Sequence, residues 1–397
     1  MNTQFENPVE HLASAQRAAM ENEPPIRRAH VTHPDEAQAV EALHAQLAMA
    51  DMAAVIFFCS DHYDPSRLAE QLNERFDCPV VGCTSAGEIG GDYGHNGIVG
   101  ISLAASHFAL HSLLIPDLDS MDPTRLVAQI NGLERDFEFS SHFDPARMFA
   151  LTLIDGLSLK EELVSSRLFG ALHGLRMIGG SAGDSLQFKQ TRVYADGGFH
   201  QHAAVLAIIE TQLDFEIFKV QHFEPTEQEL IITDCIPTRR LVKEIDGGPA
   251  AEEYAAMIGM DRQQLTPEVF SMYPLMLEVD DRWYVRSIEK ANEDGSLSFF
   301  CAIDNGLPLT LGHGNGLVDN LEALSKRLEK QFSRIDLTLG CDCILRRLEL
   351  QQTQDTPRAE ALLRGIRFTG FSTFGEQYNG IHVNHTLVGV VLGEKAS

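Results

Sequence analysis

The sequence predicts an α/β protein of layered sheets with flanking helices, built from repeated units of strand, helix, strand, glycine loop and strand. Two observations carry this prediction. Apolar runs of strand length alternate with segments in which apolar residues recur at helical spacing. In addition, a short motif of hydroxyl, small or aromatic residue, glycine and carboxylate follows the second strand of each unit, at residues 84–88, 180–184 and 372–376.

Composition alone argues against a nucleic-acid-binding, membrane-spanning or secreted protein. The 397 residues include 57 Asp and Glu against 31 Lys and Arg, a net charge of −26. This charge repels phosphate backbones and anionic lipid headgroups, so we expect no direct binding to nucleic acid. The apolar runs are too short for membrane insertion, and the N-terminal residues show no secretory signal. Seven cysteines without a CxxC pair fit reduced thiols, so we expect a cytoplasmic protein.

The first unit follows a leader. Residues 1–33 are polar and show no sustained period, so we expect a flexible N-terminal leader there. Asp35 begins a helical pattern, and Asp64 with Pro65 marks a second helix start, because Asp caps a helix and Pro suits its first position. Strands of this unit are predicted at residues 53–59, 79–82 and 99–103.

Two further units repeat this order. In the second unit, Ser158 followed by Glu161 is a capping-box signal for the start of the helix. In the third unit, a helical stretch ends near Leu363. Strands are predicted at residues 148–154, 176–178 and 203–209, and at residues 337–344, 366–368 and 387–392.

A segment of a different kind separates the second and third units. Residues 230–316 contain a predicted helix at 250–257 and a hairpin with its turn at 293–295. We therefore place a boundary near residue 230. The predicted domains are residues 34–229 and residues 230–397.

One glycine motif resembles a catalytic pattern. Residues 179–183 match the G-x-S-x-G elbow, in which Ser181 would be the nucleophile on a strand-to-helix turn. The residues after Gly183 instead read as a loop and a hairpin. We therefore favour a glycine turn and expect no enzyme, and a serine hydrolase stays an alternative.

The acidic residues that end the three motifs are Glu88, Asp184 and Glu376. If the repeats pack about a common axis, these carboxylates converge and could hold an amine or a metal ion. Each could equally be a solvated turn residue. Cys341 and Cys343 point to one side of a strand, and we interpret them as buried structural cysteines, because zinc sites usually show two such pairs.

Histidines on apolar strand faces are candidate haem ligands, because haem needs an imidazole among side chains that can cover the porphyrin. His222 ends an apolar face, and His200 follows a hairpin turn. His382 shares a strand face with Asn384. For each of these histidines, a hydrogen-bonded structural role is the competing interpretation.

Several long motifs stand out along the chain, at residues 81–88, 177–184, 220–223, 340–347 and 370–386. These motifs resemble the FIST sensory proteins, and together they are similar to the branch of that family called NosP. At His385 the chain differs from similar proteins, which more often have glutamine at this position.

The resemblance implies a bacterial cytosolic haem protein that senses nitric oxide. Its signal would pass to a separate histidine kinase or cyclic-di-GMP enzyme, often with an effect on biofilm growth. No CxxCH is present, so haem b would be held without covalent attachment, with His222, His382 or His200 as candidate ligands of the iron. The oligomeric state, including a homo-oligomer, stays open.

A sensor of small, amino-acid-like ligands without haem is the alternative that FIST domains in general imply. Its pocket would use the polar residues of the glycine motifs together with one residue of the last motif stretch. These candidates are Ser85, Glu88, Ser181, Asp184, Thr373, Glu376 and Asn384.

Overall fold

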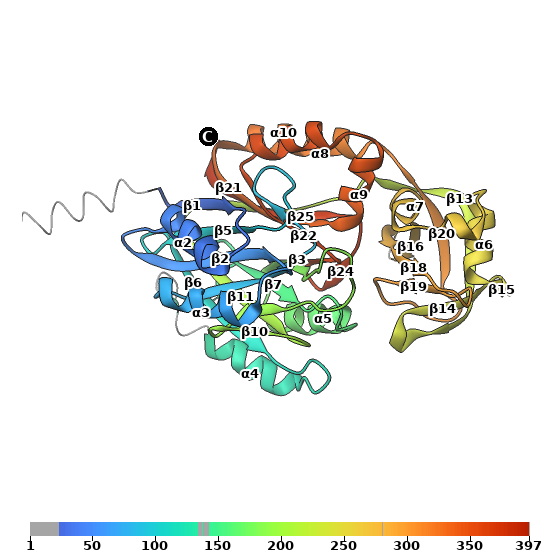
Figure 1. Ribbon diagram of the computed structural model, residues 1–397, viewed down its shortest axis with the longest axis horizontal. Coiled ribbons are helices and arrows are strands. Elements are labelled where there is room, and N and C mark those ends of the chain that lie inside the picture. Colours follow the sequence, from blue (N-terminus) through green and yellow to red (C-terminus); the bar gives the residue numbers. More distant parts are fainter. Residues whose placement is uncertain (1–23, 134–136, 138–142, 280, 397) are drawn as a thin grey trace, which may run out of the picture.

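The computed structural model describes residues 24–133, 137, 143–279 and 281–396. Over these residues the chain forms a large body and a smaller lobe, at the left and right of Figure 1. The body comprises residues 24–220 and 315–396, and the lobe comprises residues 223–314. No helix in the described part of the chain is long and apolar enough to cross a membrane.

The first sheet of the body arises from the first repeat. Its two helices, α2 (Glu36–Leu47) and α3 (Pro65–Arg75), begin where predicted, because the side chains of Asp35 and Asp64 accept hydrogen bonds from main-chain N–H groups of the first turn. The strand order is β1 (Ile26–Val31), β5 (Ile98–Ala104), β2 (Met52–Ser60), β3 (Val80–Ser85), β9 (Val193–Ala195) and β10 (Gly198–His200).

The second sheet is flanked by α4 (Pro123–Leu133) and α5 (Glu161–Ala171), at the bottom of Figure 1. Its strand order is β24 (Ile381–Val383), β23 (Glu376–Tyr378), β8 (Arg176–Ser181), β7 (Met148–Ile154), β11 (Ala204–Thr211) and β6 (Phe108–Ile115).

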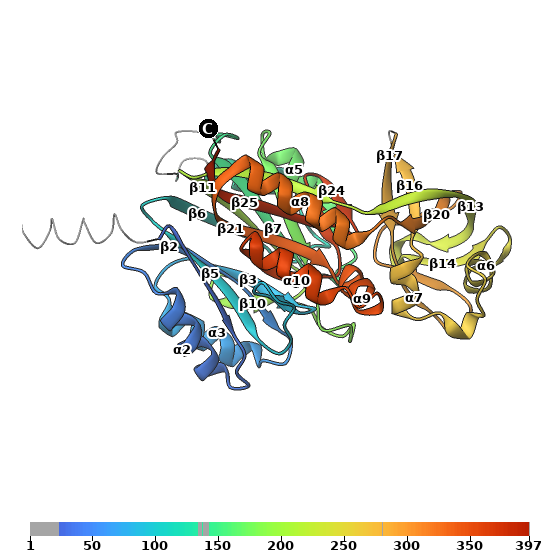
Figure 2. The ribbon, with the colours of Figure 1, turned by 90° about the horizontal axis from the view of Figure 1, so that it is seen from above.

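The third sheet is flanked by α8 (Leu317–Gln331), α9 (Ile344–Gln352) and α10 (Thr356–Gly365). Figure 2 shows α8 and α10 lying on a different side of the body from α2 and α3. The strand order is β12 (Asp214–Val220), β25 (Leu387–Lys395), β21 (Phe332–Cys343), β22 (Phe368–Thr373) and β4 (Glu88–Ile89).

Each sheet includes a strand that comes from another repeat. The strand after the first motif, β4, pairs with β22 of the third sheet. The strand after the second motif, β9, pairs with β3 of the first sheet, and β23 after the third motif pairs with β8 of the second. The three repeats therefore exchange strands in a closed cycle, which joins them into one body.

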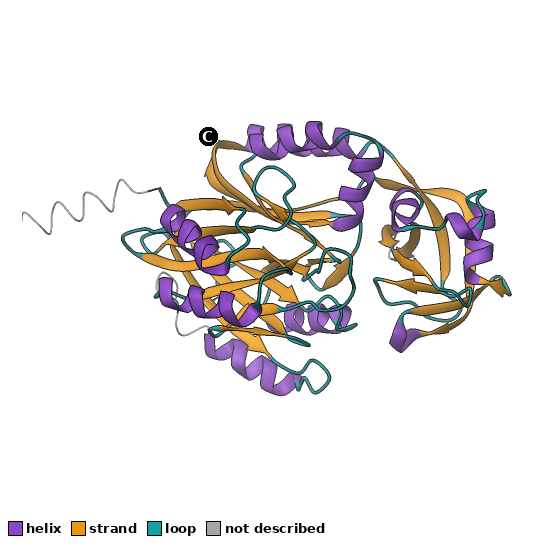
Figure 3. Ribbon diagram, in the orientation of Figure 1, coloured by secondary structure: helices purple, strands orange, loops and turns teal. Residues whose placement is uncertain are grey.

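The apolar residues divide according to the strand pleat. In β2, Ile56 and Phe58 face a central core that receives side chains from all three sheets, whereas Val55 and Phe57 face α2 and α3. Separate clusters lie between the second sheet and α4 and α5, and between the third sheet and α8 and α10. In Figure 3 the strands accordingly fill the body and the helices lie outside them.

The lobe has its own core, formed by a curved sheet with α6 (Ala250–Met257) and α7 (Pro267–Met272). It leaves the body after β12 and returns at α8. Its strands are β13 (Phe223–Ile236), β14 (Leu241–Ile245), β15 (Gly248–Pro249), β16 (Leu275–Val279), β17 (Arg282–Arg286), β18 (Ile288–Ala291), β19 (Leu297–Phe299) and β20 (Pro308–Gly314).

The α/β class with repeated units is confirmed, but three local expectations need correction. Residues 26–31, assigned to a flexible leader, form β1, because they pair with β5 and bury Ile26 and Val31; residues 1–23 lie outside the described part. The capping box does not form: α5 begins at Glu161 after Lys160, and Ser158 Oγ accepts from Lys160 N at 3.3 Å. The proposed boundary near residue 230 falls within β13.

Candidate functional site

The three glycine motifs meet where their sheets join. Main-chain hydrogen bonds link each motif to another: Gly183 N donates to Thr84 O at 3.1 Å, and Ala86 N donates to Ser372 O at 2.9 Å. Ser181 N donates to Gly375 O at 2.8 Å. We call this hydrogen-bonded set of loops, residues 84–88, 180–184 and 372–376, the motif ring.

The motif hydroxyls and carboxylates act within their own loops. Ser85 Oγ donates to Glu88 Oε1 at 2.7 Å, and Gly97 N donates to Glu88 Oε2 at 3.1 Å. Thr373 and Thr386 hold the Glu376 carboxylate in the same way. Gly97 and Thr386 immediately precede β5 and β25, so the two glutamates have equivalent roles in their repeats.

Asp184 secures its loop differently, by accepting hydrogen bonds from three successive N–H groups, those of Phe188, Lys189 and Gln190. Each of the three motif carboxylates is therefore engaged inside its own loop. The alternative that they are solvated turn residues is wrong, because all three are buried. Burial raises the pKa of Glu88, and it raises the pKa of Glu376 to about 8.

Ser181 is hydrogen bonded to an amide rather than to an imidazole. Gln377 Nε2 donates to Ser181 Oγ at 2.9 Å and to His382 Nδ1 at 3.2 Å. A serine nucleophile needs a base that takes its proton, and an amide nitrogen donor cannot do so. The hydroxyl therefore helps to hold the second and third motifs together.

His382 is enclosed at the contact with the lobe. Its Nδ1 accepts from Gln377, so its Nε2 carries the proton and faces Phe300 O of the lobe at 3.4 Å. Burial lowers the pKa of His382 to about 4, and the nearby Glu162 opposes this shift. The imidazole is therefore neutral at physiological pH.

His222 lies where the chain passes from body to lobe. Arg346 Nη1 lies 3.4 Å from His222 Nδ1, and Glu349 Oε2 lies 2.8 Å from His222 Nε2. Arginine only donates, so Nδ1 accepts and Nε2 carries the proton. Burial and the charge of Arg346 lower the pKa of His222 to about 2, and burial raises the pKa of Glu349 to about 7.

This histidine belongs to a buried polar chain that the sequence alone did not reveal. Tyr93 Oη donates to Asp342 Oδ2 at 2.6 Å, and Arg346 Nε donates to Asp342 Oδ1 at 2.6 Å. From Arg346 the chain continues through His222 to Glu349. Asp342 lies in β21 and Arg346 in the first turn of α9, so the four-residue spacing of a helical ion pair could not have revealed their contact. Cys341 and Cys343 are buried free thiols, as expected.

His200, the third predicted haem ligand, is only half-buried, on the edge strand β10. Its Nε2 lies 3.1 Å from Ala195 O, across the same hairpin. The three predicted haem ligands thus lie in three different settings.

Two neighbouring side chains of the last motif stretch contrast with these satisfied groups. Asn384 is 1% exposed, and neither its Oδ1 nor its Nδ2 has a hydrogen-bond partner among the described residues. His385 is 0% exposed, and neither ring nitrogen has such a partner. Its ring packs edge-on against Phe223 of the lobe, with centroids 5.1 Å apart. Buried polar atoms are nearly always satisfied, so this pair is the strongest indication of a bound species.

We call the buried group of Gln377, His382, Asn384 and His385 the lobe junction, because two of its members, His382 and His385, contact the lobe at Phe300 and Phe223. Arg240 of the lobe lies 2.6 Å from Glu161 Oε2 of α5 and also pairs with Glu162. Phe300 of the lobe packs with Phe188 and Phe374, at centroid distances of 5.9 and 5.8 Å.

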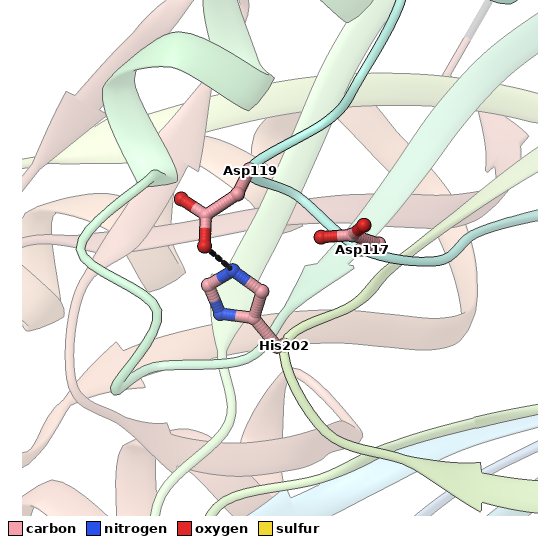
Figure 4. A group of neighbouring side chains, drawn as sticks. All are labelled: Asp117, Asp119 and His202. Atoms are coloured by element: carbon pink, nitrogen blue, oxygen red, sulfur yellow. Dashed lines mark hydrogen bonds and ion pairs between the residues drawn. The ribbon is translucent and has the colours of Figure 1, made fainter.

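One cluster on the surface has a composition that could bind metal. Asp117, Asp119 and His202 approach one another beyond the end of β6, as Figure 4 shows. Lys160 Nζ and His202 Nε2 lie 2.7 and 2.8 Å from the two oxygens of Asp119, and Ser120 Oγ donates to Asp117 at 2.6 Å. These partners account for the exposed carboxylates without a metal ion.

The fold and the site define a two-part α/β protein with a buried polar junction between its parts. Residues 53–248 match the FIST N domain, and residues 250–379 match the FIST C domain. The chain therefore belongs to the FIST family, whose domains are sensor domains of signal transduction. Among the curated proteins compared with it, none matches.

Proposed function

We propose that this protein is a sensor whose small polar ligand binds at the lobe junction and whose signal is a change in the position of the lobe. The observation that carries the proposal is a pair of buried side chains, Asn384 and His385, whose polar atoms have no hydrogen-bond partner within the described ranges. An unsatisfied buried polar group costs about 1–3 kcal/mol, and a ligand that bonds to both groups recovers that cost.

The chemistry of the junction favours an amino-acid-like ligand. Asn384 Oδ1 and Gln377 Oε1 are buried acceptors without partners, which suit an ammonium group. Arg286 of the lobe lies near His382, because its positive charge helps to lower the pKa of that histidine. The Nε of Arg286 has no partner among the described residues, and such a donor suits a carboxylate. The motif residues predicted to line such a pocket are engaged in their loops, so among those candidates Asn384 supports this function.

Such a ligand would contact both parts of the molecule. The body and the lobe are joined by two chain crossings, at residues 221–222 and 315–316, and Asn315 N donates to His222 O at 2.8 Å between them. A ligand that binds one lobe position better than another shifts the balance between positions. A separate partner would read that shift, and the family resemblance implies a histidine kinase or a cyclic-di-GMP enzyme.

We expect one or a few L-amino acids to raise the melting temperature of the full chain. At a hundredfold excess over Kd the stabilisation is about 2.7 kcal/mol, which corresponds to a few degrees for a protein of this size. The Asn384→Ala variant should fold and lose this response. Asn131→Ala, which removes an exposed amide on α4, is the control. A wild-type protein that no amino acid stabilises would contradict the proposal, as would an unchanged response of Asn384→Ala.

Haem binding with nitric oxide sensing is the second candidate function. The hydrogen bonds of each histidine limit which of them could bind the haem iron. The predicted axial ligands do not fit haem in this arrangement, because His222 and His382 use both ring nitrogens and His200 bonds to Ala195 O. His385 has the required donor chemistry, a buried neutral imidazole with both nitrogens unengaged, beside the Phe223 ring. Bound haem would supply an iron centre for nitric oxide, and this chain would supply the imidazole.

A haem titration tests whether His385, rather than His200, binds the haem iron. If the second candidate is correct, the wild type takes up one equivalent, with a Soret band that shifts when nitric oxide is added to the ferrous form. His385→Ala should then weaken haem binding about tenfold or more, whereas His200→Ala should retain it. Equal haem binding by the wild type and His385→Ala would exclude His385, and the absence of a stable Soret band would exclude this function.

A further inference from the structure

A pocket of about 440 Å³ lies on the body beside the lobe, at the open edge of the third sheet. Residues 217–221 line it along β12, residues of one face of α8 line the opposite side, and Tyr378 of β23 lies between the second and third sheets. Its size is typical of a site for a small molecule. None of the lining residues is Asp or Glu.

Positively charged side chains lie in and next to the pocket: Lys219 and Arg327 line it, and Arg176 contacts two of its lining residues, Ile217 and Tyr378. Lys219 Nζ lies 4.9 Å from the ring centre of Tyr284 in the lobe and 6.0 Å from that of Tyr378. Arg176 Nη2 donates to Tyr378 Oη at 3.2 Å and to Ile217 O at 2.9 Å.

Two of these cations, Lys219 and Arg176, are not paired with carboxylates in the part of the chain that the structure describes. Among the described residues, neither Lys219 nor Arg176 has a carboxylate oxygen within 4.0 Å, and neither does the nearby Arg282. Such a group of cations is unexpected in a chain with a net charge of −26, where acidic partners are abundant. By contrast, Arg327 at the outer end of the pocket pairs with Glu216 at 2.7 Å.

Two amide oxygens of the pocket, Asn320 Oδ1 and Gln221 Oε1, are buried and have no partner among the described residues. Rotating the Asn320 amide by half a turn places its nitrogen donor at the same point without losing a hydrogen bond to Oδ1. The Gln221 amide nitrogen already donates to Phe223 O and Trp283 O, so its oxygen stays an acceptor. Beside the charge, the pocket therefore offers an anion one amide donor, that of Asn320.

We propose that this pocket binds a small multivalent anion, with Lys219 and Arg176 supplying the charge. A lysine ammonium and an arginine guanidinium without carboxylate partners are the groups that bind phosphate and carboxylate oxygens in proteins. Lys219 belongs to the body, whereas Tyr284 beside it belongs to the lobe. An anion bound to Lys219 therefore lies next to the lobe.

This site is distinct from the lobe junction. Tyr378 lines the pocket, whereas its neighbour Gln377 bonds to Ser181 and His382, because successive side chains of β23 point to opposite faces of the sheet. Ligands at the two sites can thus be tested separately.

Calorimetric titration of the full chain with pyrophosphate, and separately with citrate, tests the proposal at constant ionic strength. We expect one anion to bind per chain, and the stronger of the two probes shows whether the pocket favours phosphate or carboxylate. Lys219→Gln should weaken binding about tenfold or more, because a charge-assisted contact is lost. Lys219→Arg should retain binding, which shows that charge is required.

Lys326→Gln is the matched control, because Lys326 is a lysine of α8 whose side chain is 71% exposed and pairs with Glu322. It should bind the anion as the wild type does, and so should Asn384→Ala. The proposal is overturned if Lys219→Gln binds the probe as well as the wild type, or if neither pyrophosphate nor citrate binds at millimolar concentration. A circular dichroism spectrum of each variant confirms that it is folded.

Discussion

Replacing Asp342 with asparagine is expected to lower the free energy of unfolding by about 3–5 kcal/mol, because it leaves the Arg346 guanidinium buried without its counterion. Arg346 and Asp342 are each 1% exposed, and the two side chains are 2.6 Å apart. The change also removes the carboxylate that accepts from Tyr93. Urea unfolding followed by circular dichroism measures the effect.

A second aspartate–arginine pair provides the control. Asp319 lies 2.8 Å from Arg358, with side chains 74% and 51% exposed, so Asp319→Asn should cost less than about 1 kcal/mol. Combining Asp342→Asn with Arg346→Met should be less destabilising than the sum of the two changes, because no charge then remains unpaired. Equal effects of Asp342→Asn and Asp319→Asn would show that burial does not determine the strength of the pair.

Gly183→Ala is expected to lower the free energy of unfolding by about 1–3 kcal/mol, because the added methyl group has no room in the motif ring. A Cβ at this glycine would lie 2.6 Å from Ala86 N, a main-chain atom that cannot turn away as a side chain could. The collision forces apart the first and second motifs, which Gly183 N and Thr84 O join. Thermal and urea unfolding measure the loss.

Gly132→Ala is the matched control, since it adds the same methyl group near the end of α4, where no atom of the described residues lies within 4 Å. Alanine is favoured over glycine in a helix by up to about 1 kcal/mol, so this variant should be as stable as the wild type or more stable. If Gly183→Ala unfolds at the wild-type urea concentration, the motif ring is not the tight contact described here.

The strand exchange gives a structural reason for the recurrence of the glycine motifs. Each motif must end one strand, contact another repeat and send the next strand to a neighbouring sheet. Glycine permits the close contacts, and the buried carboxylate fastens the loop that returns to the repeat's own sheet. The same features that suggest a binding site in the sequence therefore serve the assembly of the body.

Local patterns were sufficient for most elements. Asp64 with Pro65 predicted the start of α3, and the apolar run at 53–59 predicted β2, because capping and burial act between residues close in sequence or on one strand. The edge strand β1 escaped prediction, since its pairing with β5 involves residues about seventy positions away. The capping box failed for a related reason: Glu161 pairs with Arg240 of the lobe instead of capping α5.

The repeated α/β units, the acidic net charge, the buried cysteines and the family follow from sequence patterns alone. Which polar residues are satisfied depends on the folded chain. His222 lies at the end of an apolar strand face, yet Arg346 and Glu349, more than a hundred residues away, occupy both of its nitrogens. His385 was not among the predicted iron ligands, yet neither nitrogen of its imidazole has a partner among the described residues. These hydrogen-bond partners come from segments that are distant in sequence, so the local spacing of residues cannot predict them.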